Sequence, residues 1–346
     1  MTYFLGVHRM KLIIQIPCFN EAETLSIALT ALPRYVPGFD SVEWLIIDDG
    51  SQDETINVAK ANGVDHVVRH LGNKGLARAF MTGLEASLSL GADVIVNTDA
   101  DNQYNADDIP TLVQPILEHR AEIVVGARPI ETIKHFSPIK KLLQKLGSWV
   151  VRVASKTDIP DAPSGFRAMS RTAAQKLMVF NDYTYTLETI IQAGQKNMTI
   201  VSVPIRVNAD LRPSRLVKSI PSYIKRSIGT IIRIFVIYRP FRFFGTIGAV
   251  LFSVGFLIGL RFLGDYLQGN GEGHIQSLIL ASVLLGMGFQ TILVAFLADL
   301  LAANRKLLED VRFKMTILTN NEKYGMTEIA ESAMKKKSSH NEEIGL

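Results

Sequence analysis

The chain has 346 residues, enough for one large domain or two ordinary ones. An apolar content of 47% is high for a soluble protein and indicates membrane-embedded segments, while a net charge of +4 is only a mild basic excess, so we expect no nucleic-acid partner. A single cysteine, Cys18, excludes an intrachain disulfide and a cysteine-based zinc site. The first twenty residues lack a signal-peptide pattern, which predicts a cytoplasmic N-terminal part.

Strands and helices are predicted to alternate through roughly the first 130 residues. An apolar run is expected to form each strand, and Pro17 is expected to end the first. Ser51 and Glu54 have capping-box spacing, so a helix is expected over 52–61. Short connections between such elements predict βαβ units and a parallel sheet with helices on both faces. The predicted strands are 11–16, 42–47, 64–68, 94–97 and 121–126, with a further strand at 200–207.

The fourth predicted strand ends in two carboxylates, Asp99 and Asp101, with one residue between them. If the chain is still extended there, strand alternation points both to the same side. Two carboxylates at the end of a buried strand repel each other and lose water, so they need a cation. Oxygen ligands suit Mg²⁺ or Mn²⁺, and Mg²⁺ usually also binds substrate phosphates. The central hypothesis is a metal–diphosphate site, and the alternative is an acidic loop without a metal.

Polar side chains gather after three of the predicted strands. In open parallel sheets, ligands bind outside the carboxyl ends of the strands. These ends therefore predict one convergent site, whose acid and amide groups are Asn20 and Glu21, Asp48 and Asp49, and Asp99 and Asp101.

Two apolar runs, about 243–263 and 277–298, are each long enough to cross a bilayer at about 31 Å. A buried helical hairpin of a soluble protein is the alternative. Lys and Arg flank the pair but are absent from the connecting loop 264–276, which predicts that both ends are cytoplasmic. The spacing Gly255-x-x-x-Gly259 suits packing between helices or between protomers in a homo-oligomer, or reflects the frequency of glycine in membrane helices.

The stretch 216–238 is basic and amphipathic, which is typical of a segment in the membrane interface; an ordinary surface helix is the alternative. We therefore expect a multi-pass protein of the plasma membrane with a cytoplasmic catalytic domain. The expected parts are a catalytic domain at 1–211, juxtamembrane interfacial helices at 212–242, a transmembrane hairpin at 243–302, and a C-terminal helix with a mobile tail at 303–346.

Six motifs occur in the order found in inverting glycosyltransferases of family 2, which the chain resembles over about residues 11–240. It is most similar to the dolichyl-phosphate mannose synthase and polyprenyl-phosphate glycosyltransferase branch. Phe19 stands where many relatives have tyrosine, Asn102 where many have leucine, and the Arg-Trp pair of processive polysaccharide synthases is absent from the sequence. The motifs are Pro17-Cys-Phe-Asn20-Glu21, Asp48-Asp49-Gly50-Ser51, Asn73-Lys-Gly75, Asp99-Ala-Asp101-Asn-Gln103, Val125-Gly-Ala-Arg128 and Ser164-Gly-Phe-Arg167.

The resemblance implies an α/β GT-A fold, which is Rossmann-like with a mostly parallel sheet. It also implies transfer of a sugar, with inversion, from a UDP- or GDP-sugar to a polyprenyl or dolichyl phosphate, using Mg²⁺ or Mn²⁺. Asp99 and Asp101 would hold the metal, and Asp101 would act in catalysis with Arg128 and Asp161. The nucleotide-sugar would be bound by Pro17, Phe19, Glu21, Asp49, Asp99 and Gln103.

Several of these roles have structural alternatives. Pro17 ends a strand whether or not it touches a nucleotide, and Asp48 is expected to cap the next turn. Arg128 would otherwise form a surface salt bridge. Asp161 could orient a sugar hydroxyl, act as a base, or cap its loop.

The acceptor phosphate would meet Arg128, Arg212, Ser214 and Arg215, with Lys140 or Lys141 as further candidates. Attraction to anionic lipids is the alternative role of these basic residues, at about 1 kcal/mol each. Two other functions stay open: a transferase acting on a hydroxyl of a glycolipid or glycan, which needs a base such as Asp161, and a non-catalytic membrane scaffold.

Overall fold

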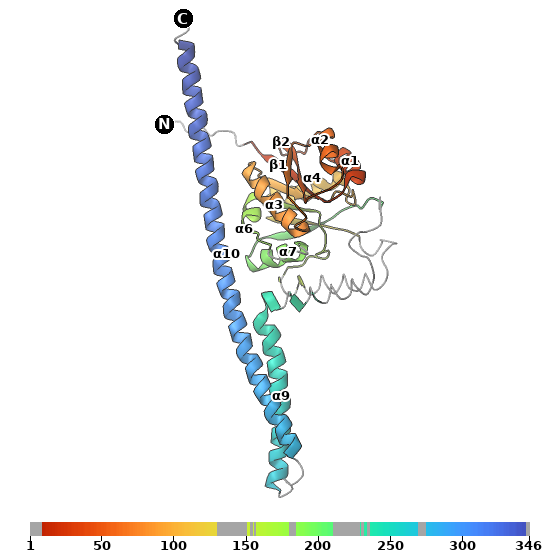
Figure 1. Cartoon of the computed structure of the whole chain (residues 1–346), viewed down its shortest axis with the longest axis vertical. Helices are drawn as coiled ribbons and strands as arrows, with labels where there is room; N and C mark the ends of the chain where they lie inside the picture. The colour runs from red at the N-terminus through yellow and green to blue at the C-terminus, as the bar shows by residue number, and fades with distance from the viewer. Residues whose placement is uncertain are drawn as a thin grey trace. The chain divides into compact units, whose positions relative to one another are not determined.

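The computed structural model describes residues 9–129, 151–152, 155, 157–179, 185–209, 229, 232–233, 236–268 and 275–343. The chain forms two compact units (Figure 1). One contains Met1–Leu216 and Val311–Leu346, and the other contains Val217–Asp310.

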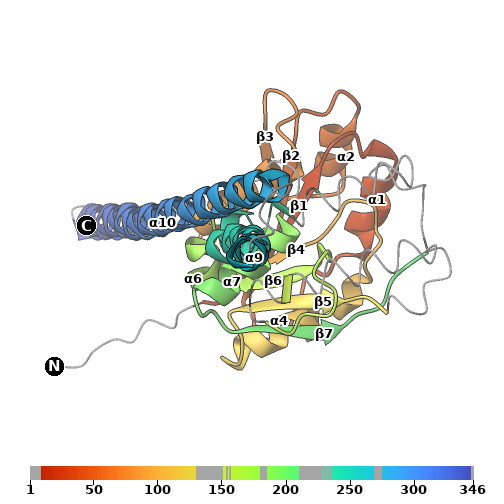
Figure 2. The ribbon, with the colours of Figure 1, turned by 90° about the horizontal axis from the view of Figure 1, so that it is seen from below.

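The described part of the first unit is built on a seven-stranded sheet in the order β3-β2-β1-β4-β6-β5-β7 (Figure 2). Neighbouring strands run parallel except for β6, which is antiparallel to both β4 and β5. The expected mostly parallel α/β sheet is therefore confirmed. The strands are β1 (Lys11–Cys18), β2 (Ser41–Asp48), β3 (His66–Arg69), β4 (Val94–Asn97), β5 (Ile123–Ala127), β6 (Arg167–Ser170) and β7 (Ile200–Pro204).

Helices pack on the two faces of this sheet, and β1 in its interior is buried on both. Leu12, Ile14 and Ile16 of β1 join one buried cluster with side chains of α1 and α4. Gln15, on the opposite face of β1, lies against α3, where a Cβ on Gly83 would be 2.6 Å from the Gln15 amide oxygen. The helices are α1 (Ala22–Ala31), α2 (Thr55–Ala61), α3 (Leu76–Ser89), the 3-10 turn η1 (Ala106–Asp108), α4 (Ile109–Leu117), α6 (Arg171–Lys176) and α7 (Thr186–Gln195).

Several element boundaries differ from the sequence prediction, and two of these differences have a local cause. Strand β1 continues through Pro17, which pairs with Ile47 of β2. The ladder with β4 ends at Gln15, so the missing N–H of Pro17 costs no hydrogen bond on that side. Helix α2 begins at Thr55 rather than at residue 52, because the Ser51 hydroxyl accepts a hydrogen bond from the Asn20 N–H at 2.9 Å instead of capping the helix.

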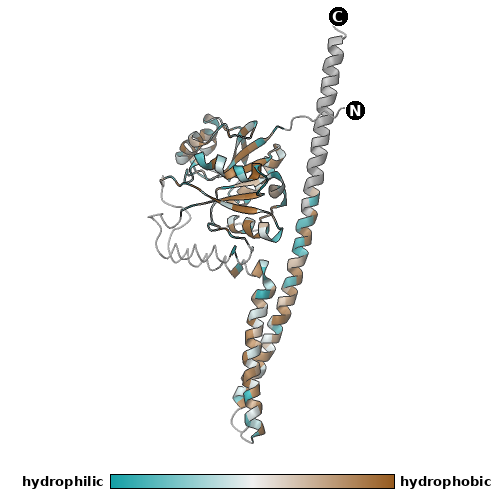
Figure 3. Cartoon of the chain, turned by 180° about the vertical axis from the view of Figure 1, so that it is seen from behind, coloured by the Kyte–Doolittle hydropathy of each residue, from teal (hydrophilic) through white to brown (hydrophobic). Residues whose placement is uncertain are grey.

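In the second unit, α9 (Pro240–Leu267) and the first part of α10 (Ile275–Glu343) are long and apolar enough to cross a membrane (Figure 3). Helix α10 continues to Glu343, whereas the sequence predicts a mobile tail after about residue 322.

Glycines allow α9 and α10 to approach each other closely. A Cβ on Gly255 would lie 2.9 Å from the Leu284 Cβ, so this glycine of the predicted motif packs within the hairpin.

Candidate active site

Asp99 and Asp101 lie in a turn immediately after β4. The strand ends at Asn97 and the chain turns at residues 100–101, so the extended geometry assumed for the two carboxylates is wrong. Asn102 completes the turn with a φ of 56°, a left-handed conformation that asparagine tolerates better than most residues. The two acids are therefore brought together by a turn rather than by strand alternation.

Asn208, which follows β7, hydrogen-bonds the backbone of this turn. The Asn208 side-chain amide donates to the carbonyls of Asn102 at 2.9 Å and Tyr104 at 3.2 Å. The Asn208 N–H donates to the Gln103 carbonyl at 2.9 Å, and the Gln103 N–H donates to Asp101 at 3.2 Å. Four hydrogen bonds thus hold the backbone that carries the acidic residues.

The charge balance of the turn suits a cation. Burial, with the neighbouring charge of Asp101, raises the pKa of Asp99 to about 7 against the opposing charges of Arg128 and Arg167. A divalent cation between the two carboxylates would favour their ionised forms. Within the described part of the chain, no group of three or more His, Cys, Asp or Glu side chains is placed to hold a metal. Mg²⁺ in proteins is commonly bound by one or two carboxylates together with substrate phosphates.

Arg128 follows β5 and is paired with Asp161. Its Nε and Nη2 donate to the two carboxylate oxygens of Asp161 at 2.7 and 3.0 Å, and its backbone N–H donates to the same carboxylate at 3.1 Å. The charge of Arg128 also reaches Asp99, where it opposes the rise in pKa. The structure thus places Arg128 and Asp161 together beside the acidic turn. Their ion pair is buried, so the alternative of a surface salt bridge for Arg128 is wrong.

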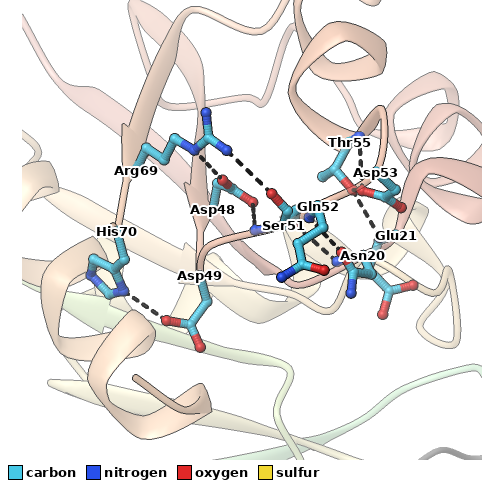
Figure 4. A network of polar contacts seen from close by, with 10 residues as sticks. All are labelled: Asn20, Glu21, Asp48, Asp49, Ser51, Gln52, Asp53, Thr55, Arg69 and His70. Atoms are coloured by element: carbon cyan, nitrogen blue, oxygen red, sulfur yellow. Dashed lines mark hydrogen bonds and ion pairs between the residues drawn. The ribbon is translucent and has the colours of Figure 1, made fainter. Parts of the chain in front are cut away.

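Asp48, the last residue of β2, and Asp49, which follows it, point in different directions (Figure 4). Asp48 is fully buried; it accepts from the Ser51 N–H at 3.1 Å and pairs with Arg69 at 3.2 Å. Asp49 lies 2.7 Å from His70 Nδ1 and accepts from the backbone N–H groups of residues 74 and 75 at 2.9 and 2.8 Å. Asp49 therefore anchors the Asn73-Lys-Gly75 turn as well as lying where a nucleotide is expected.

The residues after β1 are placed beside these acids. The Glu21 N–H donates to the Thr55 hydroxyl at 2.9 Å, and the Glu21 carboxylate accepts from Thr24 at 3.0 Å. Phe19 is 40% exposed, so its ring is accessible to a nucleotide base. Pro17 lies inside the strand. Four of the predicted nucleotide-binding residues therefore lie at the carboxyl ends of β1 and β2: Pro17, Phe19, Glu21 and Asp49.

Some predicted residues cannot be placed, and others were not predicted. The acceptor-phosphate candidates Arg212, Ser214 and Arg215, together with Lys140 and Lys141, lie outside the described residues. Sequence reasoning missed the buried polar network around Gly165, because its members belong to four separate segments. Its side chains are Gln15, Asn97, Tyr104 and Tyr185.

The Arg167 side chain hydrogen-bonds backbone carbonyls of the loop that contains Gly165. It is fully buried at the start of β6 and donates to the carbonyls of Thr186 at 3.1 Å and Ala162 at 3.4 Å, and also to that of Ser164. Burial lowers its pKa, and the charges of Asp161 and Asp99 act in the opposite direction. The only sequence signal for this role is its place in the Ser-Gly-Phe-Arg motif.

The sequence profile of glycosyl transferase family 2 matches residues 13–178. A UDP-N-acetylglucosamine–dolichyl-phosphate N-acetylglucosaminyltransferase of Methanococcus voltae is 32% identical over 213 residues, which cover 55% of this chain and 83% of the relative. An undecaprenyl-phosphate mannosyltransferase of Micrococcus luteus is 26% identical over 218 residues, covering 60% of this chain and 88% of the relative.

Solved structures of other proteins share the fold of this chain. A glucosyl-3-phosphoglycerate synthase of Mycobacterium tuberculosis, crystallised with Mn²⁺, UDP and glucosyl-3-phosphoglycerate, matches with a TM-score of 0.52 at 21% identity. The match covers 66% of this chain and 79% of the synthase. This structural match shows the GT-A fold. The profile match and the Methanococcus relative show that this chain is a glycosyltransferase and belongs to glycosyl transferase family 2.

Proposed function

We propose that the chain transfers a sugar from a UDP- or GDP-sugar to a polyprenyl or dolichyl phosphate at the cytoplasmic face of a membrane. The observation that carries the proposal is the acidic turn beside the Arg128–Asp161 pair, in a chain with two helices apolar enough to cross a bilayer. The Methanococcus and Micrococcus relatives, whose names specify lipid-phosphate acceptors, support it. The orientation in the membrane, the domain bounds and self-association remain predictions.

In this scheme Asp99 and Asp101 would hold Mg²⁺ or Mn²⁺, which would supply Lewis-acid stabilisation of the leaving nucleoside diphosphate. Phe19, Glu21 and Asp49 bind the nucleoside. Arg128, together with Arg212, Ser214 and Arg215, binds the acceptor phosphate.

The second pKa of a lipid phosphate monoester is about 6, so a phosphate oxygen of the acceptor is largely anionic at neutral pH. That oxygen bonds to the anomeric carbon as the bond from this carbon to the diphosphate oxygen breaks, and an α-linked donor gives a β-linked product. No strong general base is needed. Both oxygens of Asp161 accept hydrogen bonds from Arg128, which supports a positioning role for this acid rather than a role as base.

The proposal is tested by incubating membranes that contain the full chain with radiolabelled UDP- and GDP-sugars and polyprenyl phosphate, then extracting the lipid. We expect label in the lipid phase only with polyprenyl phosphate and a divalent cation. Severe loss is expected in Arg215→Ala, whereas Asp161→Asn should keep substantial residual activity per molecule of folded protein.

Two other outcomes would overturn the proposal. Label on diacylglycerol or a glycan, with Asp161→Asn inactive, would indicate a hydroxyl acceptor that needs a base. Absence of UDP and GDP binding in isothermal titration, with and without Mn²⁺, would indicate a scaffold.

A further inference from the structure

His70 follows β3, and both nitrogens of its imidazole ring have a hydrogen-bond partner. Its Nδ1 lies 2.7 Å from a carboxylate oxygen of Asp49 (Figure 4), and its Nε2 lies 3.0 Å from the Thr82 hydroxyl of α3. The same Asp49 oxygen accepts from the Lys74 N–H, so it is an acceptor and the hydrogen is on Nδ1 of His70. Both His70 and Asp49 are buried. His70 thus donates a buried hydrogen bond to Asp49 and connects this acid to α3.

This hydrogen bond joins two loops that also touch through their backbones. The Asp49 carboxylate accepts two further hydrogen bonds from backbone N–H groups of the turn at 70–75. A Cβ on Gly50, whose φ is 80°, would lie 2.7 Å from the Cα of Gly72 in that turn. Because the atoms that would collide are main-chain atoms, no side chain fits between the two loops. The residues 48–52, here called the Asp49 loop, are therefore packed directly on the turn.

The Asp49 loop also holds the residues that follow β1. The Ser51 hydroxyl accepts from the Asn20 N–H at 2.9 Å, and the Asn20 side-chain oxygen accepts from the Gln52 N–H at 2.8 Å. Asn20 has a φ of 55° and lies between Phe19 and Glu21, which are expected to contact the nucleoside. A displacement of the Asp49 loop would therefore also displace Phe19 and Glu21.

We propose that His70 is a positioning residue for the nucleotide site, because it holds Asp49, and with it the Asp49 loop, against helix α3. Groups that bind a ligand keep their geometry when further hydrogen bonds and packing lock their own side chains. The inference rests on the proposed function, because it requires the nucleotide to bind at the carboxyl ends of β1 and β2. It adds a residue that lies in none of the six sequence motifs and acts without touching the nucleotide.

Two amide substitutions separate the two hydrogen bonds of His70. His70→Asn places a side-chain N–H group near the position of Nδ1, so it keeps a donor to Asp49 and loses the contact with Thr82. His70→Gln places its amide near the position of Nε2, so it keeps a partner for Thr82 and loses the donor to Asp49. Thr82→Val is a further control, because it removes only the Thr82 hydroxyl.

The test is isothermal titration of UDP, and then of GDP, into the full chain in detergent with Mn²⁺ present. His70→Gln is expected to raise the Kd of the nucleotide that the wild type binds by at least about tenfold, because Asp49 loses a hydrogen bond to a buried carboxylate. His70→Asn and Thr82→Val should raise it much less.

Thermal unfolding of the same variants separates positioning from stability. A role in stability alone would lower the unfolding midpoint of His70→Gln without changing the Kd of the folded protein. That result, or equal rises of the Kd in His70→Gln and His70→Asn, would overturn the inference while leaving the proposed function intact.

A further variant keeps the inference testable if His70→Gln does not fold. Gly50→Ala retains His70 and Asp49 but forces its Cβ against the backbone of Gly72, so it should also raise the Kd. Wild-type nucleotide affinity in this folded variant would contradict the inference. A wild-type chain that binds neither UDP nor GDP would overturn the proposed function and the inference together.

Discussion

Arg128 and Asp161 form a two-point ion pair in which Nε and Nη2 of the guanidinium meet the two carboxylate oxygens at 2.7 and 3.0 Å. Only 9% of the Arg128 side chain and 1% of the Asp161 side chain are exposed. A buried guanidinium needs a counter-charge, and Asp161 supplies it while using only part of the guanidinium's donors. The pair thus keeps a charged arginine next to the acidic turn before any phosphate binds.

Asp161→Asn is expected to destabilise the folded chain by about 3–5 kcal/mol, because the Arg128 charge then stays buried without its partner. Thermal unfolding of the purified chain measures this. The matched control is Asp158→Asn, which removes an exposed partner of Arg152 and should leave the midpoint almost unchanged. Equal midpoints for Asp161→Asn and the wild type would show that the pair contributes nothing to stability.

Phe19 is the residue with which we expect a nucleotide base to stack. Phe19→Ala should weaken UDP or GDP binding by about 1–3 kcal/mol, the usual value of stacking between an aromatic side chain and a base. Because the ring is already 40% exposed, thermal stability should change little. Tyr35→Ala is the control, since Tyr35 is an exposed aromatic of the same unit at 74%. Isothermal titration that gives equal Kd values for Phe19→Ala and the wild type would remove Phe19 from the nucleotide site.

The sequence predicted the sheet well because its strands are apolar runs that end at polar residues. The positions of Asp99 and Asp101 after β4 follow from that pattern. Strand β6 and helices α6 and α7 were not predicted, because a Pro- and Gly-containing loop at 161–166 conceals the start of β6. A short antiparallel strand of four residues has too little periodicity to stand out.

The hydrogen-bond network of the site could not be predicted from the sequence, because it depends on contacts between segments that are far apart in the chain. Gly165 hydrogen-bonds Tyr104, which is 61 residues away in the sequence, and Asn97, which is 68 residues away. Asn208 reaches Asn102 across 106 residues. Sequence spacing indicates which side chains share a strand end, but the partner of each hydrogen bond depends on the packing of loops. The Arg128–Asp161 pair belongs to the same class, since both residues were assigned roles separately.

Cys18 is expected to be inert in the folded chain. It is 2% exposed, and burial raises the pKa of its thiol well above the usual value, with the nearby charges of Glu21 and Asp48 acting in the same direction. A raised pKa means that the thiol stays protonated at pH 8, whereas the thiolate is the nucleophile. N-ethylmaleimide should therefore label the native chain slowly at pH 8 and the urea-unfolded chain rapidly. Rapid labelling of the native chain would contradict the buried position of Cys18 at the end of β1.

The hairpin of α9 and α10 is packed through small residues at intervals of seven. Gly248 and Gly255 on α9 are buried, as are Ala281, Gly288 and Ala295 on α10. A Cβ on Gly288 would lie 2.6 Å from the Phe252 backbone nitrogen, so a side chain there meets main chain that cannot move aside. Small residues that let backbones approach are the usual basis of helix association in membranes.

Gly288→Leu should therefore separate the two helices, at a cost of at least about 1–3 kcal/mol, the usual range for overpacking. Gly286→Leu is the control on the same helix, because a Cβ on Gly286 would have no neighbour within 4 Å among the described residues. Unfolding by increasing mole fractions of SDS in mixed micelles, followed by circular dichroism, compares the two. Gly288→Leu should unfold at clearly lower SDS than Gly286→Leu. Equal midpoints for the two variants would mean that α9 and α10 do not pack through Gly288, and the close approach of these helices would have to be abandoned.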